Sequence, residues 1–334
     1  MAISGGAGTG KTLLALEKAK RLASEGYATL LTCFNVPLAE YLRQSAGPCD
    51  SLTIMNFQHW CDVVRQKAGV EIPAVESLPQ RQTFFDDLLP EALVEALGRL
   101  PEERFDAIVV DEGQDFRRDW WVALQLGLRD PSDGILYIFY DNNQQIFRHD
   151  GGIPEGLASF DLTENLRNTK CIHHIARAFY TGGTLESVAP EGRPVEFVEA
   201  RSQHEVRKAV SRILQRLVVD EGVAPQDIAI LSGRVWERSA FANLDRVGNF
   251  GITRDPRGTS GKVVFETVHR FKGLERQVVI LTEMDSYVER KRNDLLYVGL
   301  TRARLHLVII GVQSTARAIR GDVNGVGPGR AGQS

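Results

Sequence analysis

The chain has 334 residues, a net charge of −3 at pH 7 and 43% apolar residues. This composition supports the buried cores of two domains and argues against a general polyanion-coating protein, although a local basic groove is compatible with it. No run of eighteen apolar residues and no basic-then-apolar leader is found, so we expect a cytoplasmic protein without a membrane segment. The four cysteines form no CxxC pair, which argues against a zinc site.

Short apolar runs alternate with helical patterns along the whole chain, which predicts an α/β fold with parallel sheets. In the first half, helices are expected to begin at Lys11, Val36, Phe57, Gln80 and Arg117. The strand candidates there are Ala28–Cys33, Ser51–Ile54, Ala107–Val110 and Ile135–Tyr140. In the second half, helices are expected at Gln203–Val218 and Arg292–Leu300, and strands at Val195–Val198, Ile228–Ser232, Val263–Thr267, Val278–Leu281 and Leu305–Ile310.

Domain boundaries are indicated by changes in composition. The stretch Gly151–Ser159 is rich in glycine and proline, which makes it the best linker candidate. We therefore expect a first domain over residues 1–150, a second domain over residues 151–318 and a flexible glycine-rich tail over residues 319–334.

A glycine-rich segment near the N-terminus matches the pattern G-x-x-x-x-G-K-[ST] of the phosphate-binding loop, or P-loop. Glycines let the backbone turn tightly, so that successive N–H groups face a phosphate chain. Lys11 would reach the β- and γ-phosphates, and the Thr12 hydroxyl would ligate Mg²⁺. The sequence therefore predicts a nucleoside triphosphate with Mg²⁺ as cofactor, bound by Gly5, Gly6, Ala7, Gly8, Thr9, Gly10, Lys11 and Thr12.

Only Met1–Ser4 precede this loop, whereas a P-loop normally follows a full strand. We expect either a clipped first strand at Ala2–Ser4 or a parent protein that continues upstream.

A second motif follows the strand candidate Ala107–Val110, where the chain reads Asp-Glu-Gly-Gln-Asp over residues 111–115. The carboxyl ends of parallel strands meet at one edge of a sheet, so these acids should lie near the P-loop. Asp111 suits a role toward Mg²⁺, either as a direct ligand or through a metal-bound water, and Glu112 suits a general base that polarises the attacking water. The alternative is an acid-rich helix N-terminus, which the helix dipole favours. The neighbouring P-loop favours the catalytic interpretation.

The segment 111–115 resembles the DExQD box of superfamily-one helicases of the UvrD/Rep type. Six further segments resemble motifs of that family in the same order, namely 32–39 (Ia), 53–59 (Ic), 141–147 (III), 162–169 (IV), 267–275 (V) and 296–304 (VI). The resemblance implies two tandem RecA-like P-loop NTPase domains with parallel sheets, which hydrolyse ATP in the cleft between them and act on single-stranded or partly duplex DNA. RNA is the alternative substrate.

The resemblance also implies roles for individual residues. Gln144 would sense the γ-phosphate, Glu275 would contact the ribose, and Arg167 and Arg302 would stabilise the charge that develops on the γ-phosphate. Because both arginines lie in the second half of the chain, hydrolysis would require the two domains to close. For the arginines the alternative is a surface salt bridge.

Single-strand binding needs aromatic platforms for bases and donors for phosphates. The resemblance carries this role to Asn35, Thr53, Phe57, His59, Phe147, Arg148 and His269. A core aromatic is the alternative for the two phenylalanines, and a structural hydrogen bond is the alternative for the two histidines. The tryptophans at 60, 120 and 121 belong to no motif and are interpreted as packing residues.

Two departures from the family pattern matter. Leu166 stands where the family has a tyrosine that stacks on adenine, so a relaxed nucleotide preference is expected. The spacing between motif Ic and the acidic box, and between motifs IV and V, leaves little room for the large 1B and 2B insertions. The chain thus resembles the compact, monomeric helicase core joined to nuclease-related domains, with a nuclease or an upstream accessory domain as partner. Three hypotheses follow: a DNA translocase or helicase, an ATPase switch that regulates a partner without unwinding, and a degenerate, inactive remnant. The intact Lys11, Asp111, Glu112, Arg167 and Arg302 argue against the third.

Overall fold

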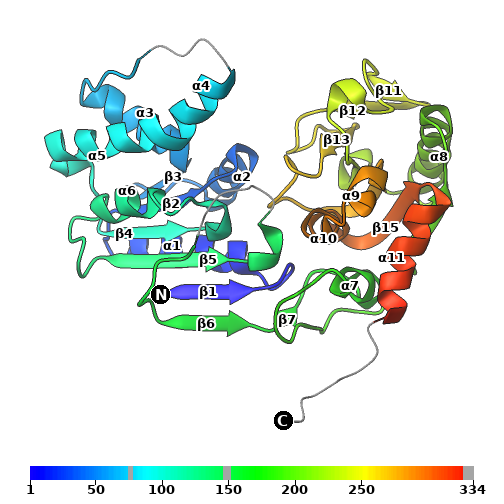
Figure 1. The fold of residues 1–334 in the computed structure, drawn as a ribbon, viewed down its shortest axis with the longest axis horizontal. Coiled ribbons are helices and arrows are strands. Elements are labelled where there is room, and N and C mark those ends of the chain that lie inside the picture. Colours follow the sequence, from blue (N-terminus) through cyan, green and yellow to red (C-terminus); the bar gives the residue numbers. More distant parts are fainter. Residues whose placement is uncertain (74–77, 146–151, 326–334) are drawn as a thin grey trace. The chain divides into compact units, whose positions relative to one another are not determined.

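The computed structural model describes residues 1–73, 78–145 and 152–325, and their contacts form two compact units (Figure 1). Unit 1 comprises Met1–Gly5 and Gly10–Leu162, and unit 2 comprises Gly6–Thr9 and Thr163–Ser334. The tip of the P-loop thus contacts mainly residues of unit 2, whereas the lysine that follows it belongs to unit 1. Each unit is built around its own sheet.

The described residues of unit 1 form a six-stranded parallel sheet in the order β3-β2-β4-β5-β1-β6. Its strands are β1 (Ala2–Gly5), β2 (Thr29–Cys33), β3 (Leu52–Asn56), β4 (Ala107–Val110), β5 (Ile135–Tyr140) and β6 (Ser159–Leu162). Strands β4 and β5 have the predicted bounds, and the α/β class with parallel pairing is confirmed.

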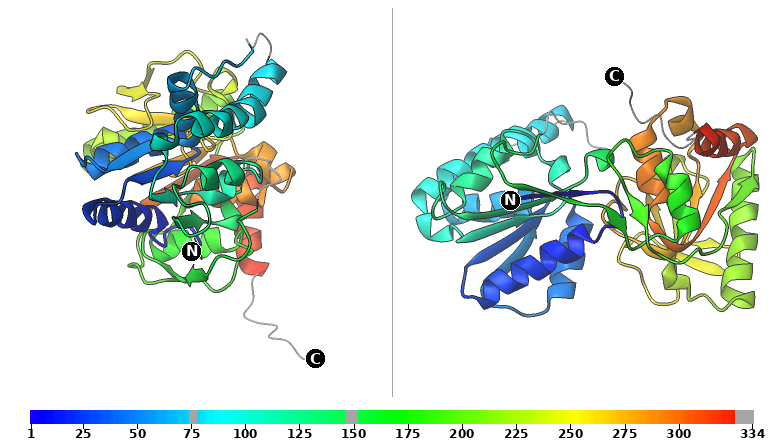
Figure 2. Two further views of the ribbon diagram at one scale, coloured as in Figure 1. Left: turned by 90° about the vertical axis from the view of Figure 1, so that its left-hand side faces the viewer. Right: turned by 90° about the horizontal axis from the view of Figure 1, so that it is seen from below.

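Helices cover both faces of this sheet. Helices α1 (Lys11–Ser24) and α2 (Val36–Ala46) pack on one face, and α3 (Phe57–Lys67), α5 (Leu89–Arg99) and α6 (Trp120–Leu126) pack on the other. Figure 2 (right) shows the deep-blue α1 and the cyan helices on opposite sides of the sheet. Side chains alternate along β4, so Ile108 and Val110 face one layer while Val109 faces the other. A strand buried on both faces therefore reads as a continuous apolar run.

Short elements join these layers. Helix α4 (Leu78–Thr83) and a π-helical turn (Phe84–Leu88) precede α5. Single 3₁₀ turns in the two units occupy Pro101–Glu103, Gly113–Asp115, Asn142–Gln144, Pro225–Asp227 and Trp236–Arg238. Within the described residues of unit 1, the segment from α3 to α5 is the whole insertion between β3 and β4, as expected for a core without a large 1B domain.

Unit 2 contains a seven-stranded sheet in its described part, in the order β11-β12-β13-β10-β14-β15-β9. The β11–β12 pair is antiparallel, and the other neighbouring pairs are parallel. Its strands are β9 (Glu196–Glu199), β10 (Ile228–Ser232), β11 (Arg246–Val247), β12 (Phe250–Thr253), β13 (Val263–Thr267), β14 (Arg276–Thr282) and β15 (Ala303–Gly311). A separate small pair joins β7 (Glu164–Asn165) to β8 (Glu186–Ser187).

The helices of unit 2 are α7 (Lys170–Arg177), α8 (Gln203–Gln215), α9 (Asp285–Glu289), α10 (Asn293–Leu300) and α11 (Gln313–Gly325), with a π-helical turn (Arg216–Asp220) after α8. Helix α8 begins after Ser202, whose hydroxyl accepts a hydrogen bond from the Glu205 N–H at 3.2 Å. Its apolar side, including Val210 and Leu214, packs on Ile230 and Phe265 of the sheet. In the described part of the chain, every helix is too short or too polar to cross a bilayer.

Two predicted boundaries differ from the structure. Strand β6 begins at Ser159, the last residue of the predicted linker, and pairs in parallel with β1, with Ile3 opposite Phe160. Residues 159–162 therefore belong to the sheet of unit 1, and the division between the units falls after Leu162 instead of residue 150. The tail predicted over residues 319–334 is wrong in its first part, because α11 continues to Gly325 and Ile319 is completely buried, and residues 326–334 lie outside the described residues.

Candidate functional site

Lys11 lies at the start of α1, directly after the glycines of the P-loop. Gly10, which precedes the helix, has φ 85°, a left-handed conformation that glycine adopts without steric cost. The buried Lys11 side chain donates from Nζ to the Gly5 carbonyl at 2.8 Å, and Nζ lies 4.0 Å from Asp141 Oδ2. Its ammonium is thus held where β1 and β5 end at the same edge of the sheet.

Asp111 follows β4 at that edge and is completely buried. Its Oδ1 accepts the Glu112 N–H at 3.0 Å, while its buried Oδ2 has no hydrogen-bond partner among the described residues. Burial raises the pKa of Asp111 to about 7, and the Glu112 charge acts in the same direction. A hydrogen bond with the Thr12 side chain and the charge of Lys11 lower the pKa of this carboxyl.

Asp111 and Thr12 together offer oxygen ligands of the kind that Mg²⁺ prefers. Asp111 has a hydrogen bond with the Thr12 side chain and one buried oxygen without a partner among the described residues, and neither burial nor the neighbouring acid favours its charge. A divalent cation would supply the missing favourable interaction. The residues present therefore fit the predicted metal.

Glu112 has φ 57°, an uncommon backbone conformation for a residue other than glycine. Its carboxylate accepts a hydrogen bond from Gln114 Nε2, and Gln114 Oε1 accepts the Asp141 N–H at 2.9 Å. Gln144 donates from Nε2 to Asp141 Oδ2 at 2.7 Å. A buried chain of hydrogen bonds thus runs from Glu112 through Gln114 and Asp141 to Gln144, and Asp141 connects it to Lys11.

Gln114 and Asp141 are residues to which the sequence analysis gave no role. Asp141 follows β5, just as Asp111 follows β4, and the two strands are neighbours in the sheet. The rule that functional groups gather at the carboxyl ends of parallel strands could have identified Asp141. Gln114 becomes recognisable only when its two amide contacts are seen.

The residues Gly6–Thr9 have their contacts in unit 2. The Ala7 N–H donates to the Tyr297 hydroxyl oxygen at 2.7 Å, and the Leu166 N–H donates to the Gly8 carbonyl at 2.9 Å. A Cβ atom at Gly8 would lie 2.3 Å from Asn165 Oδ1, so this close approach requires glycine. Tyr297 is a further contact that the sequence analysis did not anticipate.

Arg167 and Glu275 form an ion pair in unit 2, with Arg167 Nε 2.5 Å from Glu275 Oε2. Arg304 Nε lies 3.5 Å from the other oxygen of the same carboxylate. The two residues predicted to contact the γ-phosphate and the ribose are therefore brought together by the fold.

Arg302 is 1% exposed and follows α10. Its Nε donates to the Val298 carbonyl at 3.0 Å, its Nη1 to the Leu274 carbonyl at 3.3 Å and its Nη2 to Thr301 Oγ1 at 3.1 Å. The guanidinium is thus held by groups of its own unit rather than extended into solvent.

Among the residues predicted to contact nucleic acid, Phe57 requires correction. Its side chain is 0% exposed, and its ring packs on Trp120, Phe116 and Trp60 with centroid separations of 5.1, 5.5 and 6.2 Å. Phe57 is a core residue and presents no face to a base. The prediction that the tryptophans are packing residues is confirmed, because Trp60, Trp120 and Trp121 are all buried.

The other predicted nucleic-acid residues occupy several environments. In unit 1, Asn35 is buried before α2, Thr53 is half-buried on β3, and His59 is exposed on α3. In unit 2, His269 is half-buried, with its ring 6.2 Å from that of Tyr287. Burial and then the nearby Arg292 lower the pKa of His269. Phe147 and Arg148 lie outside the described residues.

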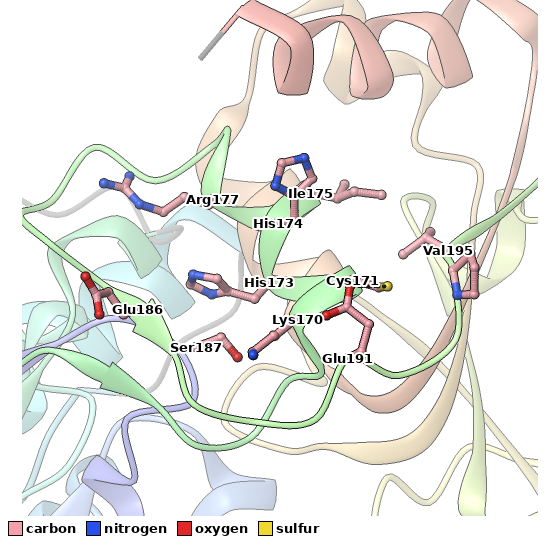
Figure 3. Close-up of a pocket in the computed structure, with 11 residues that line it drawn as sticks. Lys170, Cys171, His173, His174, Ile175, Arg177, Glu186, Ser187, Glu191 and Val195 are labelled. Atoms are coloured by element: carbon pink, nitrogen blue, oxygen red, sulfur yellow. Dashed lines mark hydrogen bonds between the residues drawn. The ribbon is translucent and has the colours of Figure 1, made fainter. Parts of the chain in front are cut away.

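A surface pocket of about 680 Å³ adjoins α7 in unit 2 (Figure 3). Side chains of both charges line it, including Lys170, Arg177, Glu186 and Glu191. None of the residues that line it is among the predicted ATP or nucleic-acid residues.

Comparison with known proteins supports the resemblance. Residues 262–310 match the family described as UvrD-like helicase C-terminal domain. This segment contains β13, β14, α10 and most of β15, together with Glu275 and Arg302. This part of unit 2 is therefore similar to the UvrD-like helicase C-terminal domain.

Two solved structures match this chain, each with 14% sequence identity. One is described as the structure of PRRSV helicase, with a TM-score of 0.48 over 94% of this chain and 52% of that chain. The other is a complex of arterivirus nonstructural protein 10 (helicase) with DNA, with a TM-score of 0.44 over 96% of this chain and 62% of that chain. The present chain thus spans between half and two thirds of the length of these structures.

Proposed function

We propose that this chain hydrolyses ATP with Mg²⁺ and uses the energy to translocate along single-stranded DNA. The observation that supports hydrolysis best is the buried polar chain at the carboxyl edge of the unit 1 sheet. It joins Glu112 and Gln144 and meets the P-loop lysine through Asp141. These are the groups that phosphoryl transfer to water needs: a phosphate-binding cation, a base and a polar sensor.

In the proposal, each residue of the candidate site in unit 1 has a chemical task. The Lys11 ammonium neutralises charge on the β- and γ-phosphates, and Asp111 with Thr12 holds Mg²⁺, which supplies further neutralisation. Glu112 orients the attacking water and accepts its proton. The hydrogen bond from Gln114 fixes the direction of the Glu112 carboxylate.

Unit 2 supplies the groups proposed to act on the charge that develops during hydrolysis. Arg167 and Arg302 carry this role, and Glu275 is proposed to bind the ribose. Arg302 now donates to backbone carbonyls, so the proposal requires it to exchange at least one of these bonds during turnover. Hydrolysis therefore needs both units.

The proposed DNA contacts come from side chains that follow the motifs of the helicase family. His59 is exposed on α3 and is suited to a base or phosphate contact. Asn35, Thr53 and His269 are more buried and are suited to hydrogen bonds with the phosphate backbone.

The decisive experiment is the ATPase rate of the purified chain with Mg²⁺, measured without nucleic acid, with single-stranded DNA and with single-stranded RNA. We expect DNA to stimulate hydrolysis. The proposal fails if neither nucleic acid binds or changes the rate. A greater stimulation by RNA would indicate that the chain acts on RNA instead of DNA.

A second candidate function is an ATPase switch that signals nucleotide occupancy to a partner, such as a nuclease, without unwinding. It is favoured by the small size of the insertion between β3 and β4, which in the described part of unit 1 consists of α3 to α5 and short turns. A strand-displacement assay with a duplex bearing a single-stranded overhang separates the two functions. Processive displacement by this chain alone would exclude the switch.

A further inference from the structure

Tyr297 makes a hydrogen bond that neither the motifs nor the proposed hydrolysis explains. It lies on α10 and is 1% exposed, and this helix is labelled in Figure 1. Its hydroxyl oxygen accepts the Ala7 N–H at 2.7 Å, and its ring packs beside that of Tyr180 at 5.5 Å. All of these residues belong to unit 2, which includes the tip of the P-loop.

Ala7 belongs to the set of loop amides that face a bound phosphate chain. A backbone N–H is a single donor, so the tyrosine hydroxyl oxygen and a phosphate oxygen are alternative acceptors for it. The approach of the two groups is close. A Cβ atom at Gly6 would lie 3.0 Å from the Tyr297 hydroxyl and 2.4 Å from Leu185, so Gly6 leaves space for the contact.

The end of α10 connects Tyr297 to Arg302. The Tyr297 carbonyl accepts a hydrogen bond from Thr301 Oγ1 at 2.8 Å, and Thr301 Oγ1 in turn accepts one from Arg302 Nη2 at 3.1 Å. Arg302 Nε donates to Val298, the residue after Tyr297, at 3.0 Å. A change in the position of Tyr297 would therefore be transmitted to the Arg302 guanidinium through one turn of helix.

We propose that Tyr297 is a positioning residue that holds the P-loop through the Ala7 amide and gives this amide up to a phosphate oxygen when nucleotide binds. The exchange frees α10 and so transmits nucleotide occupancy to Arg302. The inference rests on the proposed function, because it requires the loop to bind ATP. In this inference the Tyr297 hydroxyl oxygen competes with a phosphate oxygen of the nucleotide for the Ala7 N–H.

The test is the affinity of Tyr297→Phe for a fluorescent ATP analogue in the presence of Mg²⁺. The substitution removes one oxygen and keeps the ring, so the Ala7 amide no longer has to be released. Loss of a competing hydrogen bond should tighten binding by about three- to tenfold. A residue that only supports the fold would give the opposite result, because its loss weakens binding.

Tyr180→Phe is the matched control, because it removes a hydroxyl from the neighbouring ring and leaves the Ala7 acceptor in place. We expect its affinity to equal that of the unmodified chain. If the unmodified chain binds no nucleotide, the proposed function is wrong. If it binds nucleotide and Tyr297→Phe binds equally or more weakly with an unchanged circular dichroism spectrum, the role of Tyr297 is wrong.

A second measurement needs no variant. Gly6–Ala7 is the single Gly-Ala dipeptide in the sequence, so labelling with ¹³C′-glycine and ¹⁵N-alanine selects the Ala7 amide in a carbonyl-correlated spectrum. Saturation with Mg²⁺ and a non-hydrolysable ATP analogue should shift this resonance as its acceptor changes. If the Ala7 resonance does not shift at saturation, the proposed exchange of its hydrogen-bond acceptor is wrong.

Discussion

Arg167 and Glu275 are paired by a contact of 2.5 Å between Nε and Oε2, although the helicase motifs assign them to different parts of the nucleotide. Arg167 is mostly buried, with 19% of its side chain exposed. Arg304 approaches the same carboxylate from solvent. Glu275 therefore orients Arg167, and a ribose contact and a phosphate contact would be set by one ion pair.

Arg167→Ala should lower kcat for ATP hydrolysis by about 100-fold or more, because it removes a cation proposed to stabilise the charge on the γ-phosphate. Arg167→Lys should recover only part of this loss, since an ammonium cannot reproduce the planar fork of a guanidinium. Steady-state ATPase kinetics with saturating single-stranded DNA measure both variants.

Arg304→Ala is the control for that pair, because Arg304 contacts the same carboxylate through a more exposed side chain. Its effect on kcat should stay within about threefold, as expected for an exposed ion pair. Equal losses in the two arginine variants would contradict a specific role for Arg167.

Variants of Lys11 and Glu112 should separate the effect on nucleotide binding from the effect on the hydrolysis step. Lys11→Ala removes the cation next to the phosphates and should weaken both nucleotide binding and hydrolysis. Glu112→Gln keeps the shape of the side chain but removes the base, so it should lower kcat by about 100-fold or more while nucleotide still binds. Lys20→Ala, at an exposed position of the same α1, should behave like the unmodified chain. Turnover that survives Glu112→Gln would show that another group is the base.

Parallel strands buried on both faces could be predicted from the sequence, whereas the edge strand β6 could not. Strands β4 and β5 are continuous apolar runs, β10 and β13 begin with such a run, and the predicted bounds of all four agree with the structure. In β6, the residues Ser159, Phe160 and Asp161 are exposed, so no apolar run indicates the strand. The strand is held by its backbone pairing with β1, which the sequence pattern does not reveal.

The candidate site shows the same division. The P-loop and the acids after β4 are short motifs in which sequence neighbours act together, so the sequence predicts them. The chain from Glu112 to Gln144 depends on which strands lie side by side, and the contact of Tyr297 with Ala7 joins residues 290 positions apart. The aromatic pattern around Phe57 carries no information on exposure, which is why a core residue resembled a base platform.

Phe57→Ala tests the corrected role of this residue. Removal of a fully buried ring that packs on three other aromatics should destabilise the protein by about 3–5 kcal/mol. Phe57→Leu should cost less and leave the affinity for single-stranded DNA unchanged. Thermal unfolding and fluorescence anisotropy with labelled DNA measure the two effects. A Leu variant with normal stability and weakened DNA binding would restore the base-platform interpretation.

His59→Ala is the complementary variant on the same helix, because His59 is exposed one half-turn from Phe57. Its stability should change by less than about 0.5 kcal/mol. DNA affinity should fall if His59 contacts the strand as proposed, and it should stay constant if this face of α3 is not part of the interface.

His306 should make the stability of the chain sensitive to acid. It is buried on β15, and burial lowers the pKa of its ring, as do the charges of Arg193 and Arg216, while Glu196 acts in the opposite direction. A histidine with a lowered pKa binds fewer protons in the folded state than in the unfolded state, so protonation favours unfolding. Its contribution to stability is full above the ordinary pKa of 6.5 and is lost as the pH falls below that value.

Thermal melting between pH 8 and pH 5 for the unmodified chain and for His306→Gln checks this contribution. The unmodified chain should lose melting temperature more steeply below pH 6.5 than the variant does, because glutamine binds no proton in this range. Comparison of the slopes removes any constant cost of the substitution. His204→Gln, at an exposed position of α8, should keep the slope of the unmodified chain. Since Glu196 favours the protonated ring, Glu196→Gln should make the loss with acid steeper, and a shallower loss would contradict this account of the His306 environment.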